Sequence, residues 1–224
     1  MLLSRTALPV YAARDGAYHR RRRVVNDVYD IIARDRARKF GRFIFPKMRV
    51  FEFGVGSGFN LAHLPCRLRT GHDAFCSAEL ERKRIGFRWA TEGIKTHSFD
   101  AVICHHTLEH MPDPWNALTE MRRLLVPNGL LIVNVPHEVE RQSRRFDASV
   151  KNGHLFSWTP QTLGMLLASR GFTVESVRIQ PFGYDRFAAV VARNLRGNDT
   201  LYRFIRACLL MMRPRYEIVA LCRR

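Results

Sequence analysis

The residues Val50-Phe51-Glu52-Phe53-Gly54-Val55-Gly56-Ser57-Gly58 join a short apolar run to three glycines at alternate positions. The apolar run predicts a buried strand at 49–53, and the glycines predict a turn directly after it. A chain accepts so many glycines where its backbone bends sharply or where a ligand comes close to it. The acidic Glu52 in front of the turn and the spacing of the glycines then indicate which ligand this is.

Three explanations compete for this glycine turn. A dinucleotide site needs the pattern G-x-G-x-x-G, but the third required position, counted from Gly54, is Phe59. A P-loop needs Gly-Lys followed by Ser or Thr, and the sequence contains no such triplet. The pattern that remains is acid-x-G-x-G-x-G, with Glu52 as the acid. A purely structural turn in an unrelated α/β protein is the alternative.

Strand-like and helix-like segments alternate along the rest of the chain. Strands are predicted at 49–53, 67–72, 86–90, 99–104, 130–135, 172–179 and 217–222. Helices are predicted at 59–65, 79–84, 114–125, 160–171 and 201–212. Such alternation is typical of a mostly parallel sheet with helices on both faces.

The N-terminal segment 1–46 is predicted to be a basic helical cap. It contains the run His19-Arg20-Arg21-Arg22-Arg23, followed by apolar residues at helical spacing. The whole chain carries a formal net charge of +17. Such an excess attracts phosphates, anionic membrane surfaces or acidic partners, and an arginine-rich solvated surface explains it equally well.

Cysteine content and hydropathy indicate the cellular compartment. The five cysteines include no C-x-x-C pair, which argues against a disulfide framework or a zinc ribbon. The N-terminus lacks the apolar stretch of a signal peptide, and no apolar run reaches the roughly 18 residues that span a bilayer. We therefore expect a soluble, cytoplasmic protein.

The motifs resemble those of the class I S-adenosylmethionine-dependent methyltransferases over about residues 48–180 and the last strand. The resemblance rests on the acidic glycine turn, the loop His105–His110 after a buried strand, Pro127-Asn128-Gly129 and Gly171-Phe172. Within that superfamily the chain looks like the small-molecule O-methyltransferases of types 11 and 23. This implies a seven-stranded, mostly parallel Rossmann-like sheet with an antiparallel last strand. The methyltransferase domain would span 47–224, with an insertion at about 181–215.

The resemblance also implies which residues bind the cofactor, S-adenosylmethionine. Glu52 would steady the turn and the methionine ammonium, Asp73 would bind the ribose, and His105 or His106 would flank the methionine. The glycines that would let the backbone pass close to the cofactor are Gly54, Gly56 and Gly58.

Methylation of a hydroxyl requires a base that removes its proton. Histidine is the natural base near neutral pH. The candidates in this sequence are His106, His110 and His154. A loop histidine that caps local backbone is the alternative explanation for each of them.

The segment 106–110 also fits H-x-x-E-H, a zinc-peptidase signature. That chemistry needs a long helix, whereas this segment follows a strand and precedes Pro112 and Pro114. The ubiquinone-biosynthesis O-methyltransferases carry a similar loop, E-x-x-E-H, and the resemblance implies a divalent metal there. His106 replaces the first acid of that loop, so we predict no metal.

The expected function is transfer of a methyl group from S-adenosylmethionine, as methyl donor, to an oxygen of a small-molecule, lipid-linked or glycan acceptor. Two alternatives remain open: an RNA methyltransferase, suggested by the charge, and a non-catalytic binding module on the same fold. The absence of an N-P-P-Y-type motif argues against base amines as acceptors, so nucleic acid is not favoured. The basic amphipathic helix 201–212 leaves peripheral membrane contact open. The sequence does not indicate an oligomeric state.

Overall fold

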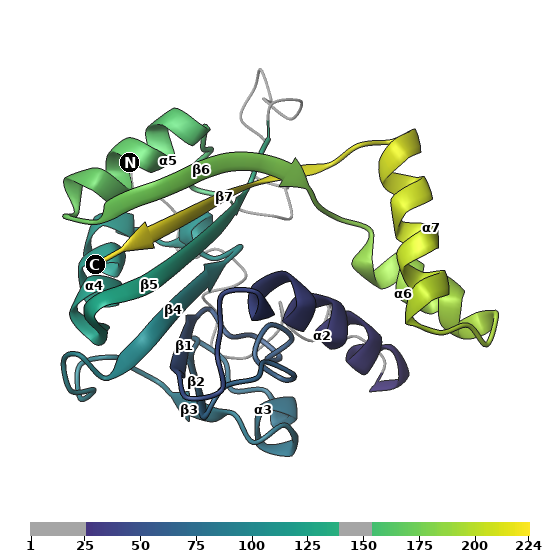
Figure 1. Ribbon diagram of the computed structural model, residues 1–224, viewed down its shortest axis with the longest axis horizontal. Coiled ribbons are helices and arrows are strands. Elements are labelled where there is room, and N and C mark those ends of the chain that lie inside the picture. Colours follow the sequence, from purple (N-terminus) through teal and green to yellow (C-terminus); the bar gives the residue numbers. More distant parts are fainter. Residues whose placement is uncertain (1–25, 139–153) are drawn as a thin grey trace, which may run out of the picture.

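The computed structural model describes residues 26–138 and 154–224, which contain a seven-stranded sheet of order β3-β2-β1-β4-β5-β7-β6 (Figure 1). The strands are β1 (Arg49–Phe53), β2 (Leu68–His72), β3 (Gly86–Arg88), β4 (Phe99–His105), β5 (Leu125–Pro136), β6 (Thr173–Pro181) and β7 (Tyr216–Arg223). Only β7 among these runs antiparallel to its two neighbours. The predicted fold class is therefore confirmed, including the antiparallel last strand.

Helices cover both faces of this sheet. They are α2 (Asn26–Gly41), α3 (Ala78–Arg82), the short 3₁₀ helix η1 (Leu108–His110), α4 (Pro114–Leu124), α5 (Pro160–Ser169), α6 (Asp185–Asn194) and α7 (Asp199–Met212). Both α4 and α5 begin with proline after a capping side chain, Asp113 and Thr159. These caps satisfy backbone N–H groups that a helix start leaves without partners, so both helices begin where the sequence predicts.

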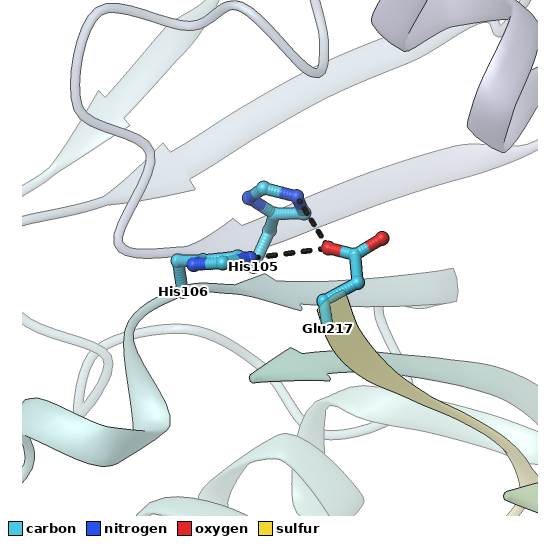
Figure 2. A group of neighbouring side chains, drawn as sticks. All are labelled: His105, His106 and Glu217. Carbon is cyan, nitrogen blue, oxygen red and sulfur yellow. Dashed lines mark hydrogen bonds and ion pairs between the residues drawn. The ribbon is translucent and has the colours of Figure 1, made fainter. Parts of the chain in front are cut away.

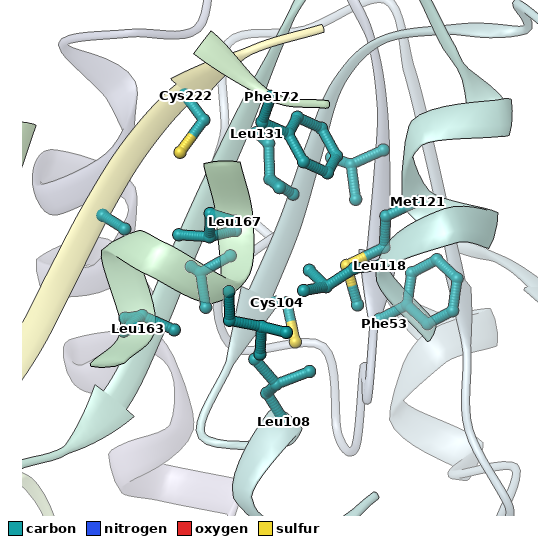
Figure 3. Close-up of a cluster of buried hydrophobic side chains, with 14 of the residues drawn as sticks. Phe53, Cys104, Leu108, Leu118, Met121, Leu131, Leu163, Leu167, Phe172 and Cys222 are labelled. Carbon is teal, nitrogen blue, oxygen red and sulfur yellow. The ribbon is translucent and has the colours of Figure 1, made fainter. Parts of the chain in front are cut away.

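The apolar core lies on the two faces of the central strands. Successive side chains of a strand point to opposite faces, so Val102 and Cys104 of β4 pack with α4 and α5 while Ala101 and Ile103 pack with α2. Figure 3 shows the first of these clusters, in which Cys104 and Leu131 meet Leu118, Met121, Leu163 and Leu167. The central strands are buried on both faces, which explains their nearly continuous apolar sequence.

A third cluster joins α2 to α6 and α7, beyond the ends of β6 and β7 (Figure 1). Val28 and Ile32 of α2 pack against Tyr202 of α7 and three alanines of α6, Ala188, Ala189 and Ala192. Alanine side chains are short, so α6 and α2 can approach each other closely. Ion pairs reinforce the contact, including Arg34 with Asp199 at 2.8 Å.

Two sequence predictions were wrong at the level of single elements. Residues 59–65 form successive turns, closed by bonds such as Leu61 N–H to Gly58 C=O, and no regular helix. The insertion contains two helices, since α6, which the sequence did not predict, precedes the predicted helix α7. The N-cap residue of α6 is Tyr184, with a φ of +62°, and its side chain makes no capping hydrogen bond.

The run His19–Arg23 lies outside the described residues, and the domain division at residue 46 stays a prediction. In the part of the chain that is described, no helix combines the length and apolarity needed to cross a bilayer.

Gly71 of β2 provides a test of how the sheet supports the glycine turn. A Cβ on Gly71 would overlap the side chain of Val55, which lies in the turn. We expect Gly71→Ala to lower the free energy of unfolding by about 1–3 kcal/mol, because overpacking forces neighbouring atoms apart. The nearest atom is the Cβ of Val55, so the loss should be smaller in Gly71→Ala/Val55→Gly than the sum of the two single changes.

The matched control for this experiment is Gly93→Ala, because a Cβ at Gly93 meets nothing within 4 Å. Its free energy of unfolding should stay within about 0.5 kcal/mol of the parent. Denaturant unfolding measures all five proteins: the parent, the two single variants, the double variant and Gly93→Ala. Equal stability of Gly71→Ala and the parent would show that Val55 does not pack against β2 as described.

Candidate active site

A cavity of about 970 Å³ lies at the carboxyl ends of β1, β2 and β4. One wall consists of three segments that follow these strands: 54–57, 72–74 and 105–107. The opposite wall comes from α2 and from residues 182–187, with Leu209 and Arg215. The carboxyl ends of parallel strands are where open α/β sheets bind ligands.

The glycine turn after β1 adopts backbone conformations that favour glycine. Gly54, Gly56 and Gly58 have φ values of +75°, +50° and +78°. A Cβ on Gly54 would overlap the side chain of Thr107, and one on Gly58 would lie 2.6 Å from Ile85. Two of the glycines are therefore required by packing, whereas Gly56 lines the cavity.

Asp73, directly after β2, holds this turn in place. Its Oδ2 accepts a hydrogen bond from the backbone N–H of Gly56 at 2.8 Å, and its Oδ1 accepts one from the N–H of Phe75 at 3.3 Å. Asp73 also lines the cavity. The carboxylate thus connects the ends of β1 and β2 at the cavity wall.

Glu52 of β1 is a fully buried carboxyl group behind the turn. Its Oε1 accepts a hydrogen bond from the amide of Asn60, a cavity residue, while its Oε2 has no hydrogen-bond partner in the described structure. Burial raises the pKa of Glu52 to about 8; the Asn60 hydrogen bond opposes this, and the nearby Asp73 charge adds to it. A buried acceptor without a partner fits a cationic ligand group such as an ammonium.

His105 and His106, at the end of β4, converge on Glu217 of β7 (Figure 2). His106 Nε2 lies 3.1 Å from Glu217 Oε2, and His105 Nε2 lies 3.6 Å from the same oxygen. Because a carboxylate only accepts, the His106 ring donates through Nε2–H and keeps its Nδ1 lone pair for a proton. His106 has a φ of +51°, uncommon outside glycine, and it lines the cavity.

Two cations of α2 surround the same cluster. Lys39 Nζ lies 2.5 Å from Glu217 Oε1 and 3.1 Å from His105 Nε2, which Arg36 Nη1 also reaches at 2.8 Å. Both cations donate only, so His105 Nε2 accepts and the ring is neutral. Burial and these charges hold the pKa of His105 well below its usual range.

The pKa values of the other members of the cluster are also shifted. Burial lowers the pKa of His106, although the hydrogen bond that His106 donates to Glu217 opposes this effect. Burial also lowers the pKa of Lys39 to about 8, against the attraction of Glu217. The pKa of Glu217 lies well below its ordinary value, because the charge of Lys39 and the hydrogen bond donated by His106 outweigh the effect of its burial.

Phe182, after β6, covers the histidine pair. Its ring lies 4.5 Å from that of His106 and 5.5 Å from that of His105, centroid to centroid. Arg36 and Lys39 lie over the same ring, at 4.6 Å and 5.0 Å. The aromatic ring therefore makes cation–π contacts with both cations and packs against both histidines at the cavity wall.

Among residues 26–138 and 154–224, two groups of side chains have donor atoms close enough to bind a metal ion, with the atoms of each group within 4.8 Å of one another. The first is His105, His106 and Glu217, where the ammonium of Lys39 already occupies the position of a cation. The second is Glu109, His110 and His154. His154 Nδ1 lies 2.8 Å from Glu138, an arrangement that often orients a metal-binding histidine. The expected absence of a metal therefore stays a prediction.

The predicted site residues separate into those that line the cavity and those that do not. The cavity is lined by Gly54, Gly56, Asp73, His105, His106 and His110. Glu52 and Gly58 do not line the cavity. His154 does not line it either and lies beside His110, with the ring centroids 4.7 Å apart.

Sequence reasoning missed Glu217, Lys39 and Asn60. Glu217 was visible as an acid at the start of an apolar strand, and Lys39 as a cation in the predicted cap. Neither signal indicates that the two side chains meet, because 178 positions separate them.

Comparisons with known proteins identify the family of this chain. The family model described as a methyltransferase domain matches residues 18–177. The probable methyltransferase ltbC of Aspergillus luteorubrus is 55% identical over 38 residues, which are 16% of this chain and 13% of that protein. The match therefore spans a small part of the relative's length.

Two solved structures show the same fold. The 1,6-didemethyltoxoflavin-N1-methyltransferase of Burkholderia thailandensis, with bound 1,6-didemethyltoxoflavin and S-adenosylhomocysteine, is 19% identical with a TM-score of 0.60. The alignment covers 100% of this chain and 93% of that one. The [4+2]-cyclase SpnF is 19% identical with a TM-score of 0.57, over 85% of this chain and 78% of that one. Because the family model covers more than half of the chain, the protein belongs to the methyltransferase-domain family.

Proposed function

We propose that the protein methylates a hydroxyl oxygen of a small-molecule acceptor bound in the cavity, with His106 as the base. The observation that carries this proposal is the 3.1 Å contact between His106 Nε2 and the buried carboxylate of Glu217. An amine acceptor attacks as the neutral base and needs no such partner, whereas a hydroxyl must lose its proton. The oriented histidine therefore favours oxygen.

The residues around the glycine turn fit S-adenosylmethionine. We propose that Glu52, with its partnerless Oε2, receives the methionine ammonium and that Asp73 accepts hydrogen bonds from the ribose hydroxyls. Gly54 and Gly56 leave the backbone bare at this wall of the cavity. When bound, S-adenosylmethionine supplies an electrophilic methyl group on a sulfonium. The protein's part is to orient the acceptor and exclude water.

His106 performs the proton transfer. Its Nε2–H donates to Glu217, which fixes the tautomer, and Nδ1 takes the proton of the acceptor hydroxyl. Glu109 Oε1, 3.9 Å from Nδ1, and Glu217 then stabilise the imidazolium from both sides. Glu217 acts through His106 and is a positioning residue.

The comparisons support a small-molecule acceptor without defining the atom. The Burkholderia thailandensis enzyme is an N1-methyltransferase bound to a small heterocycle, and SpnF is a cyclase. Fold alone therefore does not decide the reaction. The glycan, lipid-linked and RNA acceptors remain proposals that the same assays can address.

The first prediction concerns proton release when the cofactor product binds. Glu52 is protonated below about pH 8 in the unliganded protein, and an ammonium beside it favours the ionised form. Binding of S-adenosylhomocysteine should therefore release a proton. The affinity should rise by up to about tenfold per pH unit below the pKa of Glu52 and level off above it. Calorimetry in buffers of different ionisation enthalpy measures both effects.

Glu52→Gln is the matched variant for this experiment, because it keeps the shape and removes the ionisation. It should bind S-adenosylhomocysteine more weakly, and the pH dependence should disappear. A parent protein that binds without releasing a proton would show that Glu52 does not receive the ammonium. In that case Glu52 only supports Asn60 and the turn.

The second prediction concerns the base. With S-adenosylmethionine and paired acceptors that differ only in a phenol or an aniline group, the phenols should be methylated faster. His106→Gln should lower kcat for the phenols by about 10²–10⁴-fold. The parent's kcat/KM should rise with pH through a limb below 6.5, because the pKa of His106 is lowered. His106→Gln should lose this limb.

His154→Gln is the control, since His154 does not line the cavity. It should keep most of the phenol activity, and both variants should bind S-adenosylhomocysteine within a few-fold of the parent. Faster methylation of anilines, unaffected by His106→Gln, would contradict the assignment of oxygen and of the base.

A further inference from the structure

The outer surface of α6, α7 and the turns at their ends exposes several large apolar side chains. Phe187 is 59% exposed, Phe204 is 66% exposed and Met211 is 84% exposed. We call the α6–α7 face the following set: Phe187, Val190, Leu195, Arg196, Arg203, Phe204, Met211, Met212, Arg213 and Arg215. Its apolar members make up a large share of all exposed large apolar residues in the described chain. Apolar residues gathered in this way indicate an interaction surface.

The α6–α7 face lies opposite the sides of these helices that pack in the protein. Ala188, Ala189 and Ala192 of α6 and Tyr202 of α7 are buried against α2. Phe204 and Met211 are seven positions apart, which is about two helical turns, so they share one side of α7. Arg203 is exposed next to Phe204. The inner sides of both helices are therefore packed against other parts of the protein, and their outer sides are partly apolar.

The charge of this segment is strongly one-sided. Residues 185–215 contain seven arginines and two acidic residues, Asp185 and Asp199. Asp185 pairs with Arg36 and Arg206, and Asp199 pairs with Arg34 and Arg38. Both acids thus point to the inner side, toward α2. The α6–α7 face itself contains arginines and no acidic residue.

We propose that the α6–α7 face binds an anionic lipid surface. Apolar side chains interleaved with arginines are the composition of helices that lie in a membrane interface, where rings enter the acyl boundary and guanidinium groups meet phosphates. Between copies of this chain the same arginines would repel one another. Phe187 and Arg215 also line the cavity, so the cavity opens beside the bound lipid surface.

Vesicle flotation with the full chain tests this proposal. The vesicles contain phosphatidylcholine alone or phosphatidylcholine with phosphatidylglycerol. We expect the parent to float with the phosphatidylglycerol vesicles, less so as salt increases, and not with phosphatidylcholine alone. Phe204→Ser/Met211→Ser and Arg203→Gln/Arg213→Gln should each weaken the partitioning by roughly tenfold.

Two matched controls remove the same groups elsewhere on the surface. Phe45→Ser/Met165→Ser replaces a phenylalanine and a methionine that are 63% and 61% exposed. Arg67→Gln/Arg178→Gln removes two charges from other exposed positions. Both controls should float like the parent. Circular dichroism and S-adenosylhomocysteine binding, neither of which depends on lipid, verify that every variant is folded.

Other outcomes would overturn the proposal. If the parent does not float with anionic vesicles, or if the controls lose binding as much as the α6–α7 variants, this face does not bind lipid. If Phe204→Ser/Met211→Ser converts an oligomer to a monomer in light scattering while flotation is unchanged, the face joins two copies of the chain. Retention of flotation by both α6–α7 variants would assign lipid binding to another basic part of the chain.

Discussion

The buried carboxylate of Glu217 connects the parts of the protein that form the site. It contacts Lys39 from α2, His106 after β4 and Gln180 from β6, so four separate segments meet at one group. An isolated buried carboxylate is costly, and here cations and hydrogen bonds compensate the cost. Because Glu217 is the second residue of β7, the reversed direction of that strand brings it to the edge where β4 ends.

Much of the sheet could be predicted because its strands are buried on both faces. Segments such as 99–104 and 130–135 are apolar at nearly every position, and the structure has strands there. The glycine turn was predictable for a related reason, since positive φ values and close packing restrict those positions to glycine. A local sequence pattern is sufficient to predict the structure where the backbone environment permits only certain residue types.

The remaining parts depend on contacts between distant residues. The turns at 59–65 look helical in composition, yet Gly58 and the hydrogen bond from Tyr29 to Ser57 hold that chain against α2. In the sequence, Lys39 is one more cation in an arginine-rich segment, and its partner Glu217 lies near the other end of the chain. Long-range pairs of this kind leave no periodic signal. The predicted cofactor residues were local and the residues that position the base were not.

The two walls of the cavity have different origins in the chain. The wall with the glycine turn comes from three short segments that follow strands of the sheet, residues 54–57, 72–74 and 105–107. The facing wall is assembled from one side of α2, which packs on the central strands, and from residues of the segment 182–215 between β6 and β7. Substitutions in the second group can reshape one wall while the strands keep their register. If the wall with the glycine turn binds the methyl donor as proposed, the architecture lets acceptor preference diversify among related sequences while the donor site stays the same.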